Sequence, residues 1–222
     1  MIPLYFGPGD QQLFGVYEPA RQGDRASRAA VLCNPAGNEY IHAHRTMRNL
    51  ASRLSKAGYH VLRFDYYGTG DSAGDSDKGN PNRWFDDIGV AMSELRDMTG
   101  ATKITLIGLR LGANLAARVS VRDPLQIESL VLWEPLAVSH DSVKHFANDD
   151  AAAVAAMPAD MEIAELPGRT LVLLTAQDPR AADFGRLEVG HVPSPCPWVD
   201  RFFEPEVIPV QALGFIVKWL NA

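Results

Sequence analysis

One stretch decides how the chain folds: Ile104-Thr105-Leu106-Ile107-Gly108-Leu109-Arg110-Leu111-Gly112-Ala113-Asn114-Leu115-Ala116-Ala117. It starts as a short apolar run with β-branched residues and continues, past two glycines, with small residues that suit a helix. This pattern predicts a buried strand that turns sharply into a helix. The rest of the chain is best interpreted outward from this turn.

The two glycines, Gly108 and Gly112, have the spacing of a nucleophile elbow. In the Gly-x-Ser-x-Gly form of that motif, the central residue stands on a strained turn that exposes its side chain at the carboxyl end of the sheet. Here the central residue is Arg110. A guanidinium stays protonated at any working pH and has no lone pair with which to attack a carbonyl carbon. The sequence therefore predicts the scaffold of a serine hydrolase site without its nucleophile.

The length of 222 residues favours one domain, 1–222, with one sizeable core. A net charge of −6 and a pI near 5.5 argue against a nucleic-acid partner. No apolar run approaches the roughly 18 residues that a membrane span needs, so we expect a cytoplasmic protein with no membrane partner. Cys33 and Cys196 form neither a disulfide framework nor a zinc motif, and we expect no metal and no cofactor. The oligomeric state stays open.

Apolar runs and turn residues along the chain predict alternating strands and helices. The expected strands cover residues 4–6, 12–17, 29–33, 60–65, 104–109, 130–133 and 170–174, the first two forming an antiparallel hairpin at a sheet edge. The expected helices cover residues 41–57, 83–98 with Asn82 as the cap, the stretch after the elbow, and 207–220. The Ala-rich segment of about 137–167 lies between two strands, where a short lid would be inserted.

This alternation predicts an α/β fold: a mostly parallel twisted sheet with helices on both faces and a minimal lid. Ligands of such sheets bind beyond the carboxyl ends of the strands. Three stretches are expected to lie at that end: residues 34–39, residues 64–72 with the pattern Gly-x-Gly-x-Ser, and the elbow.

With these three stretches in this order, nearly the whole chain resembles the α/β-hydrolase superfamily. It is most similar to serine aminopeptidase-like hydrolases, including those associated with exosortase systems. Residues 34–39 stand where that family has its oxyanion loop, and residues 64–72 where it has Asp-x-Arg-Gly-x-Gly-x-Ser. Some members of the exosortase-associated branch resemble this chain in carrying Gly-Leu-Arg-x-Gly at the elbow, which implies that Arg110 is inherited.

The resemblance implies an oxyanion hole made by backbone N–H groups, of which Leu111 and Ala36 are the expected pair, in a loop that begins at Asn34. Asp178 stands where the family keeps its triad aspartate, although an Asp before Pro is also a common turn former. Glu134 ends the preceding strand and is a second acid at the same rim.

A triad histidine is expected roughly 25 to 30 residues after the acid, just before the last helix. That window holds Glu206 but no histidine. His191, thirteen positions after Asp178 (191 − 178), is either the base, folded back over the site, or a surface loop residue. Glu206 is either a replacement for the base or an acid favoured at a helix N-terminus.

Two functions remain open. One is a hydrolase-like protein that acts on an ester, thioester or amide of a small acyl or anionic substrate, with water activated by Asp178, Glu134 or Glu206. The other is a non-catalytic protein that binds a small anion or a partner protein at the same place.

The guanidinium of Arg110 needs a partner, because an unpaired charge in a cleft costs several kcal/mol. Glu39, Asp71, Glu134 and Asp178 reach the same rim, and we expect Glu39 or Glu134 to form a charge-assisted, bidentate bond with it. Ser72 is expected to brace its own loop through backbone hydrogen bonds and not to act as a displaced nucleophile.

Overall fold

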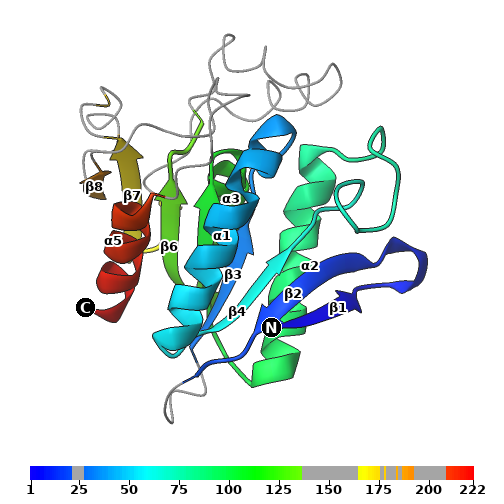
Figure 1. The fold of residues 1–222 in the computed structure, drawn as a ribbon, viewed down its shortest axis with the longest axis horizontal. Helices are drawn as coiled ribbons and strands as arrows, with labels where there is room; N and C mark the ends of the chain where they lie inside the picture. The colour runs from blue at the N-terminus through cyan, green and yellow to red at the C-terminus, as the bar shows by residue number, and fades with distance from the viewer. Residues whose placement is uncertain (22–27, 137–164, 176–177, 179–183, 185–186, 193–208) are drawn as a thin grey trace.

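The computed structural model describes residues 1–21, 28–136, 165–175, 178, 184, 187–192 and 209–222. Its strands form one sheet in the order β1-β2-β4-β3-β5-β6-β7-β8 (Figure 1). The strands are β1 (Ile2–Phe6), β2 (Leu13–Glu18), β3 (Ala29–Cys33), β4 (His60–Phe64), β5 (Ile104–Leu109), β6 (Ile127–Trp133), β7 (Thr170–Thr175) and β8 (Glu188–Val192). The helices are α1 (Asn38–Lys56), α2 (Pro81–Thr99), α3 (Leu111–Arg122) and α5 (Val210–Asn221), with short 3-10 turns η1 (Gly9–Gln11) and η2 (Pro124–Gln126).

The sheet is parallel from β4 to β8 and antiparallel at one edge. The β1–β2 hairpin pairs antiparallel, as predicted, and β2 then pairs antiparallel with β4. The other neighbouring strands pair in parallel. The structure thus confirms the expected α/β class and adds one strand, β8, where the sequence predicted a loop around His191.

Helices cover both faces of the sheet, and the parallel strands are therefore buried on both sides. Helices α2 and α3 lie on one face of the sheet, and α1 and α5 lie on the other (Figure 1). Within β5, Leu106 packs into the layer under α2 and α3, while the next residue, Ile107, packs into the layer under α1 and α5. Both side chains are fully buried, and burial of such a side chain contributes about 1.5–3 kcal/mol. The continuous apolar character of β5 in the sequence reflects this two-sided core.

Helix boundaries differ from the sequence prediction by a few residues. The first helix begins at Asn38, directly after Gly37, whose φ of 61° ends the preceding loop. The cap of α2 is Asn80, not Asn82: its side chain accepts a hydrogen bond from the backbone N–H of Arg83 at 3.1 Å, and Pro81 occupies the first helical position. The closing helix begins at Val210. Within the described ranges, no helix is long and apolar enough to span a bilayer.

Candidate active site

The strand ends that carry the site are level with one another. Cys33 at the end of β3 pairs with Gly108 of β5, Leu109 pairs with Trp133 of β6, and Trp133 pairs with Leu173 of β7. Because parallel strands share one carboxyl edge, the residues that follow them meet at the same rim. This register brings together the loop 34–39, the elbow, Glu134 and Asp178.

The elbow has the strained backbone that the sequence predicts. Arg110 has φ 55° and ψ −121°, and a positive φ is uncommon for any residue with a Cβ. Its N–H donates to the carbonyl of Trp133 at 2.9 Å, and its carbonyl accepts from the N–H of Ala113 at 2.9 Å. These bonds hold the turn between strand and helix, so that the Arg110 side chain projects from the strand end.

Both elbow glycines are required by close backbone contacts. A Cβ on Gly108 would lie 2.3 Å from the carbonyl oxygen of Gly112. A Cβ on Gly112 would lie 2.1 Å from the carbonyl oxygen of Cys33 and 2.5 Å from that of Asn34. The absence of side chains therefore lets α3 start directly against the loop that leaves β3.

An ion pair joins the elbow to the first turn of α1. Arg110 donates from Nε at 3.0 Å and from Nη2 at 2.9 Å, and both bonds go to Oε1 of Glu39. The two side chains are each 15% exposed. Of the two expected partners, Glu39 is thus the one that binds the guanidinium. The expected bidentate geometry is wrong in detail, because both donors converge on a single oxygen.

The ion pair leaves hydrogen-bonding groups of both partners unused within the described part of the chain. Oε2 of Glu39 is buried and accepts no hydrogen bond from a described residue, which is uncommon for a carboxylate oxygen. Nη1 of Arg110 makes no hydrogen bond to any residue that the structure describes. The pair therefore retains hydrogen-bonding capacity on both partners.

The expected oxyanion donors lie in suitable elements. Leu111 is the first residue of α3, and the first N–H groups of a helix have no partner within it. Ala36 lies in the loop that Gly112 brings against the helix start. The side-chain amide of Asn34 is used elsewhere, since it donates to the carbonyl of Phe64 at 2.7 Å and ties β3 to β4. Whether Leu111 and Ala36 bind an oxyanion stays a prediction.

The acids at the rim have different surroundings. Glu134 is 4% exposed, has φ 46°, and accepts hydrogen bonds from the N–H and the hydroxyl of Thr175. Asp178 lies just past β7, where its N–H donates to the carbonyl of Thr175 at 3.1 Å. Asp71 has an exposed side chain, and its N–H donates to Oδ2 of Asp65 at 3.1 Å.

The structure places one of the two candidate bases. Of the two alternatives for His191, its exposed side chain agrees with a surface residue and not with a base folded back over the site, although the residue lies on the edge strand β8 and not in a loop. Three strand spacings separate β8 from β5, about 14 Å in all, so direct contact with the elbow is excluded. Glu206 lies outside the described residues. Within the described ranges, no three His, Cys, Asp or Glu side chains are grouped to hold a metal ion.

The glycine loop after β4 is held by side chains with scaffolding contacts. The hydroxyl of Ser72 donates to the carbonyl of Asp65 at 2.6 Å and accepts from the N–H of Phe14 at 2.8 Å, which confirms its bracing role. Sequence reasoning missed two further contacts. The hydroxyl of Tyr40 donates to Oδ1 of Asp65 at 2.6 Å, and burial raises the pKa of that hydroxyl. Asp87 accepts from the N–H of Tyr67 at 2.8 Å.

Burial also determines the protonation of the Cys33 thiol. The side chain is fully buried, and this burial raises the pKa of the thiol. A thiol that stays protonated in the core is a poor nucleophile. Cys33 therefore acts as a small apolar residue at the end of β3.

The family comparison agrees with this geometry. Residues 25–179, well over half of the chain, match the model of the family described as serine aminopeptidase, S33. The chain belongs to the serine aminopeptidase S33 family. A comparison with curated proteins found no match.

Solved structures share the fold of this S33 family member at low sequence identity. Est1E from Butyrivibrio proteoclasticus with bound ferulic acid has a TM-score of 0.71 at 13% identity, covering 99% of this chain and 100% of that one. A proline iminopeptidase from Mycobacterium smegmatis has a TM-score of 0.67 at 14% identity, covering 99% of this chain and 98% of that one. XC6422 from Xanthomonas campestris, a serine hydrolase without a lid, has a TM-score of 0.69 at 17% identity, covering 99% of this chain and 93% of that one. These likenesses show the α/β-hydrolase fold.

Proposed function

We propose that this chain is a hydrolase-like protein that acts on a small ester, thioester or amide through a nonstandard site. One observation carries the proposal: the strained elbow, with φ 55° and ψ −121°, is kept although its central residue is Arg110. A positive φ on such a residue costs on the order of 1–3 kcal/mol, and strain of this kind persists at sites where it serves function.

In this proposal Arg110 does not attack the substrate. Its guanidinium, anchored by Glu39, offers Nη1 to the carbonyl oxygen or to an anionic group of the substrate. The N–H groups of Leu111 and Ala36 add hydrogen bonds to the developing oxyanion. Water replaces serine as the nucleophile, and a rim carboxylate, Glu134 or Asp178, accepts its proton.

A small carboxylic acid is a suitable ligand for such a site. Est1E has been solved with ferulic acid bound, and the present fold matches it over nearly its whole length. At 13% sequence identity, we carry over from Est1E only the chemical class of the ligand, a carboxylic acid, and not the compound. The carboxylate of such a ligand would pair with the guanidinium of Arg110.

The experiment measures hydrolysis of short p-nitrophenyl esters and acyl-thioesters by the wild-type protein and by Arg110→Gln. Arg45→Gln is the matched control, because Arg45 is an exposed residue of α1 and its side chain makes no hydrogen bond to the described part of the chain. We expect slow turnover that Arg110→Gln lowers by about tenfold or more, since a hydrogen bond to a charged group is lost. The control should keep the wild-type rate.

The second candidate function is non-catalytic binding of a small anion. The ion pair favours it, because the guanidinium and Glu39 occupy the place where a hydrolase presents its nucleophile. Absence of turnover, together with a rise in melting temperature with acetate that Arg110→Gln abolishes, would select this function. Turnover that survives unchanged in Arg110→Gln would contradict both functions as argued from Arg110.

A further inference from the structure

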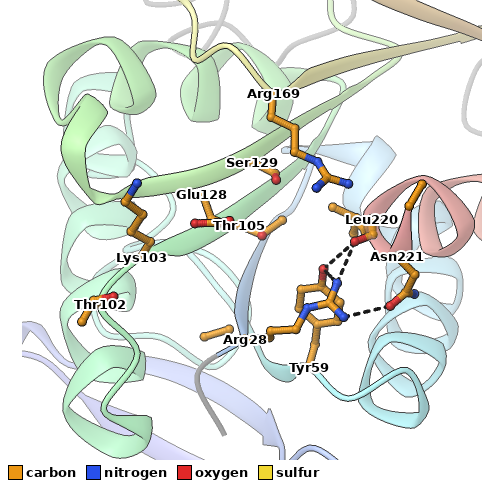
Figure 2. Close-up of a pocket in the computed structure, with 12 residues that line it drawn as sticks. Arg28, Tyr59, Thr102, Lys103, Thr105, Glu128, Ser129, Arg169, Leu220 and Asn221 are labelled. Atoms are coloured by element: carbon orange, nitrogen blue, oxygen red, sulfur yellow. Dashed lines mark hydrogen bonds between the residues drawn. The ribbon is translucent and has the colours of Figure 1, made fainter. Parts of the chain in front are cut away.

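A pocket lies at the opposite end of the sheet from the elbow. It has a volume of about 430 Å³ and is lined by residues at the amino ends of β3, β5, β6 and β7 and at the end of α5 (Figure 2). No step proposed for the elbow uses it. Its lining is mostly polar, and it includes Arg28, Lys103 and Arg169 against a single acid, Glu128.

The floor of the pocket carries two unused hydroxyl groups. Thr105 of β5 and Ser129 of β6 are direct partners in the sheet register, so their side chains lie next to each other on the same face. The two residues are only 1% and 2% exposed, and neither hydroxyl makes a hydrogen bond to a described residue. Neither hydroxyl oxygen is fully enclosed, however, so the small exposed area of each residue includes its hydroxyl. Both residues line the pocket, and their hydroxyls can donate to a molecule that enters it.

A β-bulge shapes the same place. Ile104 pairs with Ile127 and Thr105 with Ser129, which leaves Glu128 as the extra residue on β6. A bulge interrupts the alternation of side chains, and Glu128 lines the pocket beside Ser129. Figure 2 shows Glu128, Thr105 and Ser129 between Lys103 on one side and the two arginines on the other.

The cations differ in how much of their hydrogen-bonding capacity is used. Arg28 is held in place: it stacks on Tyr59, donates to the Tyr59 hydroxyl, and donates to the carbonyl of Leu220 at 2.7 Å. Arg169 donates from Nη2 to the carbonyl of Trp219 at 2.7 Å. Its Nε and Nη1, and the ammonium of Lys103, make no hydrogen bond to the described part of the chain.

We propose that this pocket binds a small oxyanion of the phosphate or phosphomonoester class. Arg169 uses one of its five N–H groups within the described part of the chain, so a parallel pair that includes the second N–H of Nη2 is available for a phosphate. Lys103 adds a point charge. The hydroxyls of Thr105 and Ser129 donate from the floor. Glu128 accepts a hydrogen bond from a protonated phosphate oxygen or from a hydroxyl of the esterified group.

The test is calorimetric titration of the full chain with inorganic phosphate and with glycerol 3-phosphate, at constant ionic strength because salt screens exposed charges. A purification tag belongs at the amino end, since Ala222 lines the pocket. We expect saturable binding with a Kd below about 10 mM. Arg169→Gln should weaken it about tenfold or more, because a charge-assisted donor pair is lost.

Three further variants make the result decisive. Lys103→Gln removes a charge without breaking any bond to the described residues and should weaken binding several-fold, even if Arg169→Gln proves unstable. Arg45→Gln, on an exposed face of α1, should leave Kd within about twofold of the wild type. Arg110→Gln should also leave the Kd for phosphate unchanged. A negative result for the phosphate pocket can then be distinguished from a negative result for the function proposed at the elbow.

The proposal is overturned if the wild-type protein shows no saturable heat up to that concentration. It is equally overturned if Arg110→Gln abolishes phosphate binding while Arg169→Gln and Lys103→Gln retain it. In that case the phosphate binds at the elbow.

Discussion

Replacing Arg110 with alanine tests the central ion pair through protein stability. The substitution removes two charge-assisted hydrogen bonds, of 3.0 and 2.9 Å, from Oε1 of Glu39. Oε2 of that carboxylate already lacks a hydrogen-bond partner among the described residues, so the substitution would leave both oxygens without one there. Breaking a buried ion pair by removing one partner costs about 3–5 kcal/mol.

The structure places the expected cost at the lower end of that range. Each side chain is 15% exposed, so water relieves part of the stranded charge. The strain at φ 55° is not relieved, because alanine also carries a Cβ. We therefore expect a loss of about 3 kcal/mol in the free energy of unfolding. For a chain of this length, this corresponds to a drop in melting temperature of about 6–12 °C.

The assay is urea and thermal unfolding of four proteins: wild type, Arg110→Ala, Glu39→Ala and the double variant. Arg45→Ala is the control for loss of a surface arginine. Because each single variant strands the other charge, the double variant should be less destabilised than the sum of the singles by about 1–3 kcal/mol. An unchanged melting temperature in Arg110→Ala, or strict additivity in the double variant, would refute the reasoning.

Three other changes test the site and its scaffold. Arg110→Ser should not produce fast ester hydrolysis, because His191 on β8 is too distant to deprotonate the new hydroxyl; a large gain in p-nitrophenyl acetate turnover would contradict this. Gly112→Ala should lower the free energy of unfolding by about 3 kcal/mol or more, because its Cβ would lie 2.1 Å from the Cys33 carbonyl oxygen. Gly214→Ala, in open space on α5, should instead raise the free energy of unfolding by about 0.5–1 kcal/mol. Urea titrations measure both, and similar effects of the two variants would refute the contact at Gly112. Burial lowers the pKa of His60, whose Nδ1 lies 2.5 Å from the Tyr17 hydroxyl, so at pH values near this pKa the unfolded chain binds more protons than the folded protein. The free energy of unfolding should therefore fall as the pH drops below about 6.5. His60→Gln should reduce this pH dependence in unfolding measured from pH 5 to 7.5, and a profile identical to that of the wild type would contradict the assignment.

Much of the fold follows from the apolar pattern of the chain. Runs such as Ile104–Leu109 are buried on both faces, and a strand of this kind has few alternatives once glycines end it. Topology also reduced the partner of Arg110 to Glu39 or Glu134, because a buried guanidinium needs an acid and few acids reach that rim; the structure selects Glu39. These inferences used properties that are local in sequence or fixed by the parallel arrangement.

What the sequence did not predict depends on contacts between distant residues. The strand β8 is short, and Gly190 in its middle weakens the pattern; the glycine fits because a Cβ there would lie 2.7 Å from the Phe215 ring of α5. The bulge at Glu128 is a matter of register between two strands and has no signal in either strand alone. The cap of α2 is a different case, because its signal is local: Asn80 directly precedes Pro81, which occupies the first helical position, and this marks Asn80 rather than Asn82 as the cap.

The elbow also bears on how such a site changes over evolutionary time. The turn is enforced by Gly108, Gly112 and backbone bonds on either side, none of which involves the side chain at position 110. A single codon change at that position can therefore exchange a nucleophile for a cation, or the reverse, while the architecture persists. Glu39 would lose its partner in such an exchange, because it is the group that meets the present side chain. A new hydroxyl at position 110 would also need a base within reach. Reactivity and foldability are thus inherited through separate residues, and on this fold a nucleophile can be lost in fewer mutational steps than catalysis can be regained.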